Sequence, residues 1–260
     1  MADYPTVTTT SSPWLVPVVS VVRPQLRLFC FLNAGGSSAM LRSWPGVLPP
    51  VVEICAVQLP GQGSRFREQP FTRITPLIEA LLPVLTPYLD LPFVFWGYSM
   101  GSLVAFELAR ALGRDQVFPQ HLFVAARRAP QVATRETPLH PLTEAAFIRE
   151  VQRRYNGIPA SVLREPDLLA LFLPVLRANL EMIETHVYEA GAPLPCPISA
   201  FGGLHDPTVS AEGIMAWGQQ TSASFKYFMY PGDHFFWQQQ QADVLQTMAN
   251  DLRALLPPNV

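Results

Sequence analysis

The chain has 260 residues, of which 49% are hydrophobic and 15% are charged. A composition this apolar and this weakly charged excludes an intrinsically disordered protein and supplies enough material for a buried core. The formal net charge of −2 gives no overall basic field for holding nucleic acid or an anionic membrane surface, so neither partner is expected. The length also suits a single α/β domain.

The first segment, residues 1–13, is rich in Thr and Ser and is expected to be a flexible tail that precedes one domain at residues 14–260. The apolar run Trp14–Val22 is too short to span a bilayer and contains Pro17. The tail also lacks the basic start of a secretory signal. We therefore expect a cytoplasmic protein without a membrane segment.

Short apolar runs then alternate with longer amphipathic stretches. Most runs are apolar on both faces, which is typical of strands in a parallel sheet that helices cover on both sides. Helices are predicted at Pro76–Leu89, with Thr75 as the N-cap, at Ser102–Leu112 and at Gln240–Leu256. This alternation predicts an α/β fold with a mostly parallel central sheet. The predicted strands are Leu26–Leu32, Val52–Leu59, Pro92–Tyr98, His121–Ala126, Pro197–Phe201 and Phe225–Tyr230.

The stretch from about 143 to 190 contains no predicted strand. Prolines, among them Pro174, divide it into three helical patterns, which lie at Glu144–Tyr155, Asp167–Phe172 and Val175–Tyr188. An all-helical insertion between two strands cannot belong to the sheet, so we expect it to cover one end of the sheet as a lid. Five apolar residues of this lid either line a substrate chamber or pack the lid onto the sheet: Phe147, Leu171, Phe172, Leu176 and Met182.

The three cysteines, Cys30, Cys55 and Cys196, are far apart in the sequence, and two of them lie within apolar runs. They are expected to be buried free thiols in a reducing compartment. Closely spaced Cys and His residues with the spacing of zinc ligands do not occur. We predict neither a metal nor another cofactor.

The sequence Gly97-Tyr98-Ser99-Met100-Gly101 directly follows a predicted strand and opens a predicted helix. This is the G-x-S-x-G pattern in the strand–turn–helix context of a nucleophile elbow. So sharp a turn leaves no room for Cβ atoms at the flanking positions, and it lifts the serine hydroxyl clear of the sheet. Ser99 is therefore the predicted nucleophile, and a chance match of the motif is the alternative.

A serine hydroxyl needs a base to become reactive. His234 follows the last strand, at the edge of a parallel sheet where catalytic groups gather, and is the predicted base, with His205 as the alternative. Asp206 follows the preceding strand and is the predicted orienting carboxylate, in preference to Asp233 beside the histidine. The order Ser99, Asp206, His234 is the order of an α/β-hydrolase triad.

Acyl transfer also needs donors for the oxyanion of the tetrahedral intermediate. The N–H of Met100, directly after the nucleophile, is the first predicted donor. The second should come from the loop after the first predicted strand, where Gly35 and Gly36 let the backbone approach a substrate closely. The N–H of Ala34 is the predicted donor there, and the N–H of Asn33 is the alternative.

Further motifs occur in the order and spacing of a known family: Leu32-Asn33-Ala34-Gly35-Gly36-Ser37, Leu59-Pro60-Gly61-Gln62-Gly63-Ser64-Arg65, Ala126-Arg127-Arg128-Ala129-Pro130, Asp206-Pro207 and Gly232-Asp233-His234-Phe235-Phe236. With the elbow, they resemble the type II thioesterases of polyketide and non-ribosomal peptide synthesis, from about Trp14 onward. Asn33 replaces the usual His, Tyr98 replaces a commoner His, and Ser102 stands where Gly is frequent. These departures bear on substrate preference more than on mechanism.

The resemblance implies an α/β-hydrolase fold with a helical lid, no cofactor, and a partner that is an acyl- or peptidyl-carrier protein. The substrate of this protein would be an acyl or peptidyl thioester on the phosphopantetheine arm of that carrier. The protein would be an editing enzyme of antibiotic biosynthesis that releases such chains. The lid would shape the acyl chamber and admit the arm. Three lid arginines, Arg149, Arg153 and Arg154, would meet an acidic carrier surface or form a solvated helix face. A monomer is expected.

Two other functions fit part of the sequence. An esterase or lipase acting on small-molecule esters would keep the fold and the triad, and the fold alone does not separate it from a thioesterase. A hydrolase-like protein that only binds would have lost a member of the triad, and none is lost here. The Leu-Pro-Gly and Arg-Arg-Ala-Pro motifs favour the thioesterase.

Overall fold

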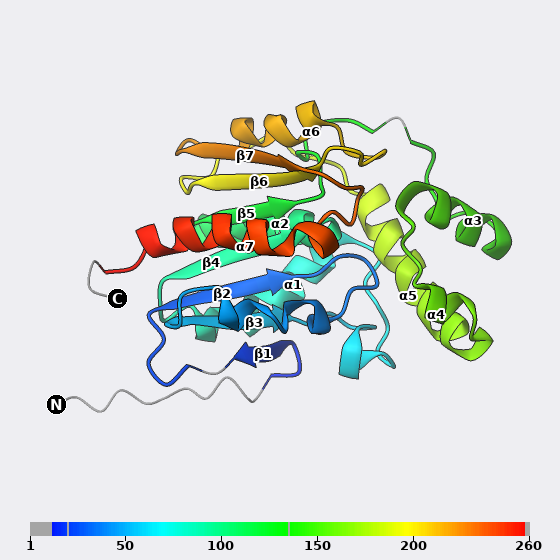
Figure 1. Ribbon diagram of the computed structural model, residues 1–260, viewed down its shortest axis with the longest axis horizontal. Coiled ribbons are helices and arrows are strands. Elements are labelled where there is room, and N and C mark those ends of the chain that lie inside the picture. Colours follow the sequence, from blue (N-terminus) through cyan, green and yellow to red (C-terminus); the bar gives the residue numbers. More distant parts are fainter. Residues whose placement is uncertain (1–11, 20, 135, 258–260) are drawn as a thin grey trace.

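The computed structural model describes residues 12–19, 21–134 and 136–257, so the predicted tail at residues 1–13 lies almost entirely outside the described residues. A seven-stranded sheet in the order β1-β3-β2-β4-β5-β6-β7 forms the centre (Figure 1). Neighbouring strands are parallel except for β1, which is antiparallel to β3. The strands are β1 (Leu15–Val19), β2 (Leu26–Phe31), β3 (Val52–Val57), β4 (Phe93–Tyr98), β5 (Leu122–Ala125), β6 (Ile198–Gly203) and β7 (Phe225–Tyr230).

The predicted α/β architecture with a mostly parallel sheet is confirmed, and β2 to β7 agree with the six predicted strands to within two residues at each end. The strand β1 is not predicted, because its apolar run is short and contains Pro17. It forms an edge of the sheet, where a proline costs few ladder hydrogen bonds. Among the described residues, no helix is long and apolar enough to cross a membrane.

Helices cover both faces of the sheet. On one face lie α1 (Ile74–Leu85), α2 (Met100–Leu112) and the short α6 (Ala211–Met215), and α7 (Trp237–Ala254) covers the other (Figure 1). Both sides of the central strands are therefore buried. Short 3-10 turns complete the connections at Ser38–Leu41, Trp44–Gly46, Gly63–Arg65, Thr86–Tyr88, Gly113–Asp115 and Ala216–Gln220.

Three predicted helix starts are late by two or three residues. Helix α2 begins at Met100 and not at Ser102, and α1 and α7 also begin earlier than predicted. Helix α1 begins at Ile74 with Arg73 as its N-cap, so Thr75 is a residue of the first turn and not the cap. The proline that follows fits because the first turn of a helix has no N–H partners to lose. Helix α7 begins at Trp237, before the predicted start, and its backbone is non-helical at Gln240.

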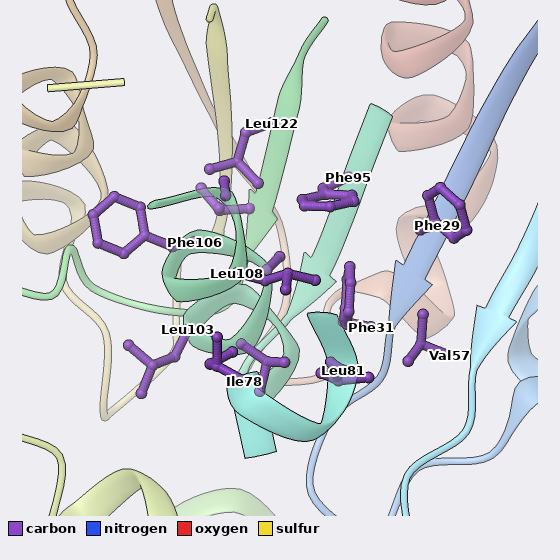
Figure 2. Packing of buried hydrophobic residues seen from close by; sticks show 14 of the residues in the cluster. Phe29, Phe31, Val57, Ile78, Leu81, Phe95, Leu103, Phe106, Leu108 and Leu122 are labelled. Atoms are coloured by element: carbon purple, nitrogen blue, oxygen red, sulfur yellow. The ribbon is translucent and has the colours of Figure 1, made fainter. Parts of the chain in front are cut away.

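The core consists of two main apolar layers. Between the sheet and α1 and α2, Phe29 and Phe31 each meet the ring of Phe95 edge to face (Figure 2). Between the sheet and α7, the rings of Trp44 and Trp96 are 4.8 Å apart and nearly perpendicular. The three cysteines are buried and free, as predicted. These layers hold the strands rigidly and so fix the positions of the loops at their ends.

Between β5 and β6 the chain forms α3 (Glu144–Tyr155), α4 (Ala160–Leu163) and α5 (Pro166–Glu184). They lie beyond the arrowheads of the parallel strands, at the carboxyl end of the sheet (Figure 1). The predicted break at Pro174 is wrong, because α5 continues through it. The proline removes one helical hydrogen bond, but the neighbouring side chains Leu173 and Leu176 are buried in the core of this helical segment and hold the helix together.

Candidate active site

Ser99 lies between the end of β4 and the start of α2, with a φ of 52° and a ψ of −110°. Non-glycine residues rarely adopt this backbone conformation, so the elbow is strained. A Cβ atom added at Gly97 would lie 2.4 Å from the carbonyl oxygen of Gly101, and one added at Gly101 would lie 2.0 Å from that of Phe31. The two glycines therefore let α2 start directly against the sheet and leave the Ser99 hydroxyl at its rim.

Two loops bring the other predicted triad residues to Ser99. The Nε2 atom of His234 lies 3.0 Å from Ser99 Oγ, and its Nδ1 atom lies 2.7 Å from Asp206 Oδ2. His234 follows β7 and Asp206 follows β6, so both come from the same end of the sheet as the elbow. The three residues form one continuous hydrogen-bonded chain from carboxylate to hydroxyl.

The Asp206 side chain is fully buried. Burial raises the pKa of this carboxyl, but hydrogen bonds from His234 and from the N–H and hydroxyl of Thr208 outweigh it and hold the pKa below its usual value. Because Asp206 Oδ1 accepts both Thr208 donors, its Oδ2 is left to His234. The carboxylate is thus kept ionised and aimed at the imidazole.

The residues predicted as alternatives lie elsewhere. His205 is exposed, and its backbone N–H donates to the Gly232 carbonyl. Asp233 Oδ1 accepts the N–H of Phe235 and does not hydrogen-bond to the histidine ring. The remaining histidine rings pair with other side chains of the described structure, namely His121 with Ser199, His140 with Glu184 and His186 with Glu107.

The two predicted oxyanion donors come from the start of α2 and from the loop after β2. Met100 is the first residue of α2, and the first N–H groups of a helix have no acceptor within the helix. Asn33 and Ala34, in the loop after β2, line the same cavity as Ser99. The Asn33 side chain donates to the carbonyl of Ala34 and not into the cavity. This hydrogen bond between neighbouring residues holds the Ala34 carbonyl in place within the loop.

A cavity of about 90 Å³ opens onto Ser99 and His234 and extends beneath α3 and α5. Of the five apolar lid residues singled out in the sequence, only Leu176 lines it. Phe147 is buried within the lid cluster and Met182 in the main core, while Leu171 is 58% exposed. Phe172 instead packs against Gly35, where a Cβ atom would lie 2.6 Å from its ring.

Three residues of the site are not predicted from the sequence. The hydroxyl of Tyr98 donates to the backbone carbonyl of His234 at 2.5 Å and so joins the elbow to the histidine loop. Thr208 could have been found, because a residue two positions after an Asp often closes a turn onto it. Asn179 of α5 accepts the N–H of Gly35 through its Oδ1 atom, and nothing in the sequence marks this contact.

No group of three or more His, Cys, Asp or Glu residues that could hold a metal ion occurs in the described part of the chain. The triad and the start of α2 bring together a serine hydroxyl, an imidazole, a carboxylate and backbone N–H groups. This set is suited to acyl transfer.

The chain is similar to known proteins over most of its length. The family model "Thioesterase domain" matches residues 26–252. The gramicidin S biosynthesis protein GrsT of Aneurinibacillus migulanus is 37% identical over 248 residues, which cover 95% of this chain and 96% of that protein. The structure of the type II thioesterase BorB from the borrelidin biosynthetic cluster superposes with a TM-score of 0.84 at 30% identity, covering 94% of this chain and 98% of BorB.

YbtT, a type II thioesterase from the yersiniabactin NRPS/PKS biosynthetic pathway, superposes with a TM-score of 0.79 at 28% identity, covering 91% of this chain and 97% of YbtT. The mostly parallel sheet is thus that of the α/β-hydrolase thioesterases, as the sequence predicted. The matches extend over nearly the whole chain, and the range of the family model contains the elbow and the two loops that carry Asp206 and His234. The chain therefore belongs to the thioesterase family.

Proposed function

We propose that this enzyme hydrolyses acyl or peptidyl thioesters carried on the phosphopantetheine arm of carrier proteins, as a type II thioesterase of polyketide or non-ribosomal peptide biosynthesis. The observation that carries the proposal is the chain of hydrogen bonds from Asp206 through His234 to Ser99, at the mouth of a cavity beneath a helical segment. A thioester suits this site because a thiolate leaves readily once the tetrahedral intermediate forms.

In the first half of the proposed reaction, Ser99 Oγ attacks the thioester carbonyl carbon while His234 Nε2 takes the hydroxyl proton. Asp206 holds the imidazole in the required tautomer and stabilises the imidazolium. The carbonyl oxygen becomes an oxyanion that accepts hydrogen bonds from the N–H groups of Met100 and Ala34. The C–S bond then breaks, His234 returns the proton to the departing sulfur, and the acyl group remains on Ser99.

In the second half, water replaces the thiol. His234 takes a proton from the water, whose oxygen attacks the acyl-enzyme carbonyl. The new tetrahedral intermediate collapses when the bond to Ser99 Oγ breaks, and His234 gives the proton back to that oxygen. The products are a free acid and the thiol of the carrier arm. Each step uses groups of the chain and water, so the proposed scheme needs no cofactor.

The carrier partner is supported by the relatives, which are named for gramicidin S biosynthesis and for NRPS/PKS and borrelidin pathways. An editing role, the release of stalled or wrongly loaded chains, follows from the same resemblance. Of the three lid arginines, Arg149 and Arg153 are exposed on α3, whereas Arg154 lines the cavity and donates to the Thr137 carbonyl. Arg149 and Arg153 are thus the two that an acidic carrier surface could reach.

The proposal is tested by comparing release of one acyl group from a loaded carrier protein, from acyl-CoA and from a matched oxygen ester. We expect markedly faster release from the carrier, and no turnover by Ser99→Ala, whose circular dichroism should match that of the unaltered enzyme. Equal rates on the three substrates would favour the small-molecule esterase. A fully active Ser99→Ala enzyme would refute the mechanism.

A further inference from the structure

Arg127 lies just after the end of β5, the strand that pairs with β4. The N–H of Ser99 donates to the carbonyl of Ala125, the last residue of β5, at 2.7 Å. Ala126 has a φ of 51°, so the chain turns sharply there, and Arg127 follows at once. The Nε1–H of Trp217 donates to the Arg127 carbonyl at 2.7 Å and fixes the backbone. Arg127 and Ser99 line the same cavity.

Other charged side chains of this cavity already have partners. Glu184 accepts the backbone N–H groups of Leu139 and His140 and pairs with the imidazole of His140 at 2.7 Å. Arg154 lies 3.8 Å from Glu136 and donates to a backbone carbonyl. Within the described residues, by contrast, the guanidinium of Arg127 makes neither a hydrogen bond nor an ion pair, so its charge faces the cavity without a counterion.

A second donor lies near it. The Tyr155 side chain lines the cavity, and its ring centroid is 5.0 Å from that of His234. In the described part of the chain its hydroxyl has no hydrogen-bond partner. Burial lowers the pKa of Arg127 to about 10 and raises the pKa of Tyr155 to about 12. At neutral pH both half-buried groups are therefore protonated donors without an acceptor among the described residues, and an oxygen of the substrate would supply one.

We propose that Arg127 and Tyr155 form a subsite for acyl chains that carry an acceptor oxygen close to the thioester, as a carboxylate or as a carbonyl group, and that this subsite disfavours chains with an ammonium group. The proposal names the substrate class of the site and rests on the proposed function. Arginine suits the role because its planar fork binds two oxygens at once and stays charged near neutral pH.

The subsite is tested by measuring release of four acyl groups of matched length from loaded carrier proteins. These groups are malonyl, acetoacetyl, butyryl and β-alanyl. They differ only at the far end, which is a carboxylate, a ketone, a methyl and an ammonium group. We expect kcat/KM to be highest for malonyl and acetoacetyl and lowest for β-alanyl. In Arg127→Gln the ratio of malonyl to butyryl should fall about tenfold to a hundredfold, the range for a charge-assisted hydrogen bond.

Two further variants separate recognition from structural damage. Arg127→Lys keeps the charge and should retain part of the preference for malonyl over β-alanyl. Arg253→Gln removes an exposed arginine near the end of α7 that donates to Asn250 Oδ1, and it should leave all four rates and their ratios unchanged. If Arg127→Gln lowers all four rates alike, the side chain binds a part common to every substrate or supports the fold, and the subsite proposal is wrong.

A direct binding measurement keeps this proposal separate from the proposed function. Pantetheine conjugates in which an amide replaces the thioester cannot be hydrolysed, and their affinity for the unaltered enzyme and for Arg127→Gln can be measured by calorimetry. The malonyl conjugate should bind more tightly than the butyryl conjugate only when Arg127 is present. No release from any loaded carrier would overturn the proposed function, whereas equal binding of the two conjugates to the unaltered enzyme would overturn the subsite.

Discussion

Tyr98 illustrates how much a single side chain next to the nucleophile can organise. Its ring is buried between the sheet and α7, and its hydroxyl donates to the backbone carbonyl of His234. Burial raises the pKa of this phenol well above its usual value, so it remains a donor. The residue that replaces the commoner histidine of the elbow therefore anchors the loop that carries His234, the proposed base, and this contact connects two segments of the proposed active site that are 136 residues apart.

Asp206 gives the sharpest prediction at the residue scale. In Asp206→Asn the amide can no longer stabilise an imidazolium and favours the wrong tautomer of His234, so kcat should fall by about 10⁴-fold, as in other Ser-His-Asp enzymes. Steady-state hydrolysis of a carrier-bound acyl group measures this. The matched control is Asp233→Asn, which removes a charge from the adjacent loop position but not from the triad, and should change kcat by less than about threefold. A similar loss in both variants would assign the role of the acid elsewhere.

Among the elements, α2 and β2 meet backbone to backbone below the elbow. The Cα of Gly101 faces the carbonyl of Phe31, and rigid backbone atoms cannot move aside for a methyl group as a flexible side chain could. The strain at Ser99 is thus maintained by a contact between two elements and not by the turn alone. Ser102 also holds α2 to the sheet, because its hydroxyl donates to the carbonyl of Gly97 in β4 and accepts the N–H of Ala125 in β5.

Gly101→Ala should therefore lower the free energy of unfolding by about 3 kcal/mol or more, as expected of severe overpacking, and should lower kcat because the elbow shifts. Urea denaturation followed by circular dichroism gives the first quantity. The control is Gly46→Ala, at a position where an added Cβ atom would meet no atom within 4 Å. Equal stability of the two variants would contradict the close contact between α2 and β2.

Helix α5 contacts the loop after β2, which carries the proposed oxyanion donor Ala34. Asn179 accepts the N–H of Gly35, and Phe172 packs on the same glycine. Two contacts from one helix therefore support the loop that carries Ala34. A displacement of α5 would change this support, so the conformation of the loop and the position of the helix are coupled.

The sequence predicts most elements, and the exceptions have physical causes. Most of the strands β2 to β7 are recognisable because both of their faces are apolar. The elbow is recognisable because an added Cβ atom would clash at both of its glycines. The break predicted at Pro174 fails since burial of the neighbouring side chains offsets one lost hydrogen bond. Contacts such as Asn179 to Gly35, 144 residues apart, depend on how the lid segment packs, and no local pattern encodes that.

At the scale of the whole molecule, a second buried polar network lies at the opposite end of the sheet from Ser99. His121 Nε2 lies 3.0 Å from Ser199 Oγ, which donates to Asp251 Oδ2 at 2.8 Å, and Lys226 pairs with the same carboxylate. Burial lowers the pKa of His121 to about 4; Asp251 opposes this shift and Lys226 adds to it. The network joins β5, β6, β7 and α7.

This network predicts how stability depends on pH. The usual pKa of histidine, about 6.5, applies in the unfolded chain, so between pH 6.5 and 4 the unfolded state binds a proton at His121 more readily than the folded state. The stabilisation from this site is complete above pH 6.5 and is lost as the pH falls to 4, by about 3 kcal/mol. Urea denaturation at several pH values measures this loss, and His121→Gln should lose less stability across the interval. Parallel curves for the two proteins would rule out His121 as the source.

Lys226 is the only lysine among the 260 residues. Its side chain is 54% exposed and lies near the start of β7, whereas the triad gathers where the parallel strands end. An amine-reactive support or fluorophore thus has one side-chain target, on the far side of the sheet from the reactive serine. Enzyme attached through it would be oriented uniformly, with the mouth of the cavity turned away from the surface and open to a large protein substrate.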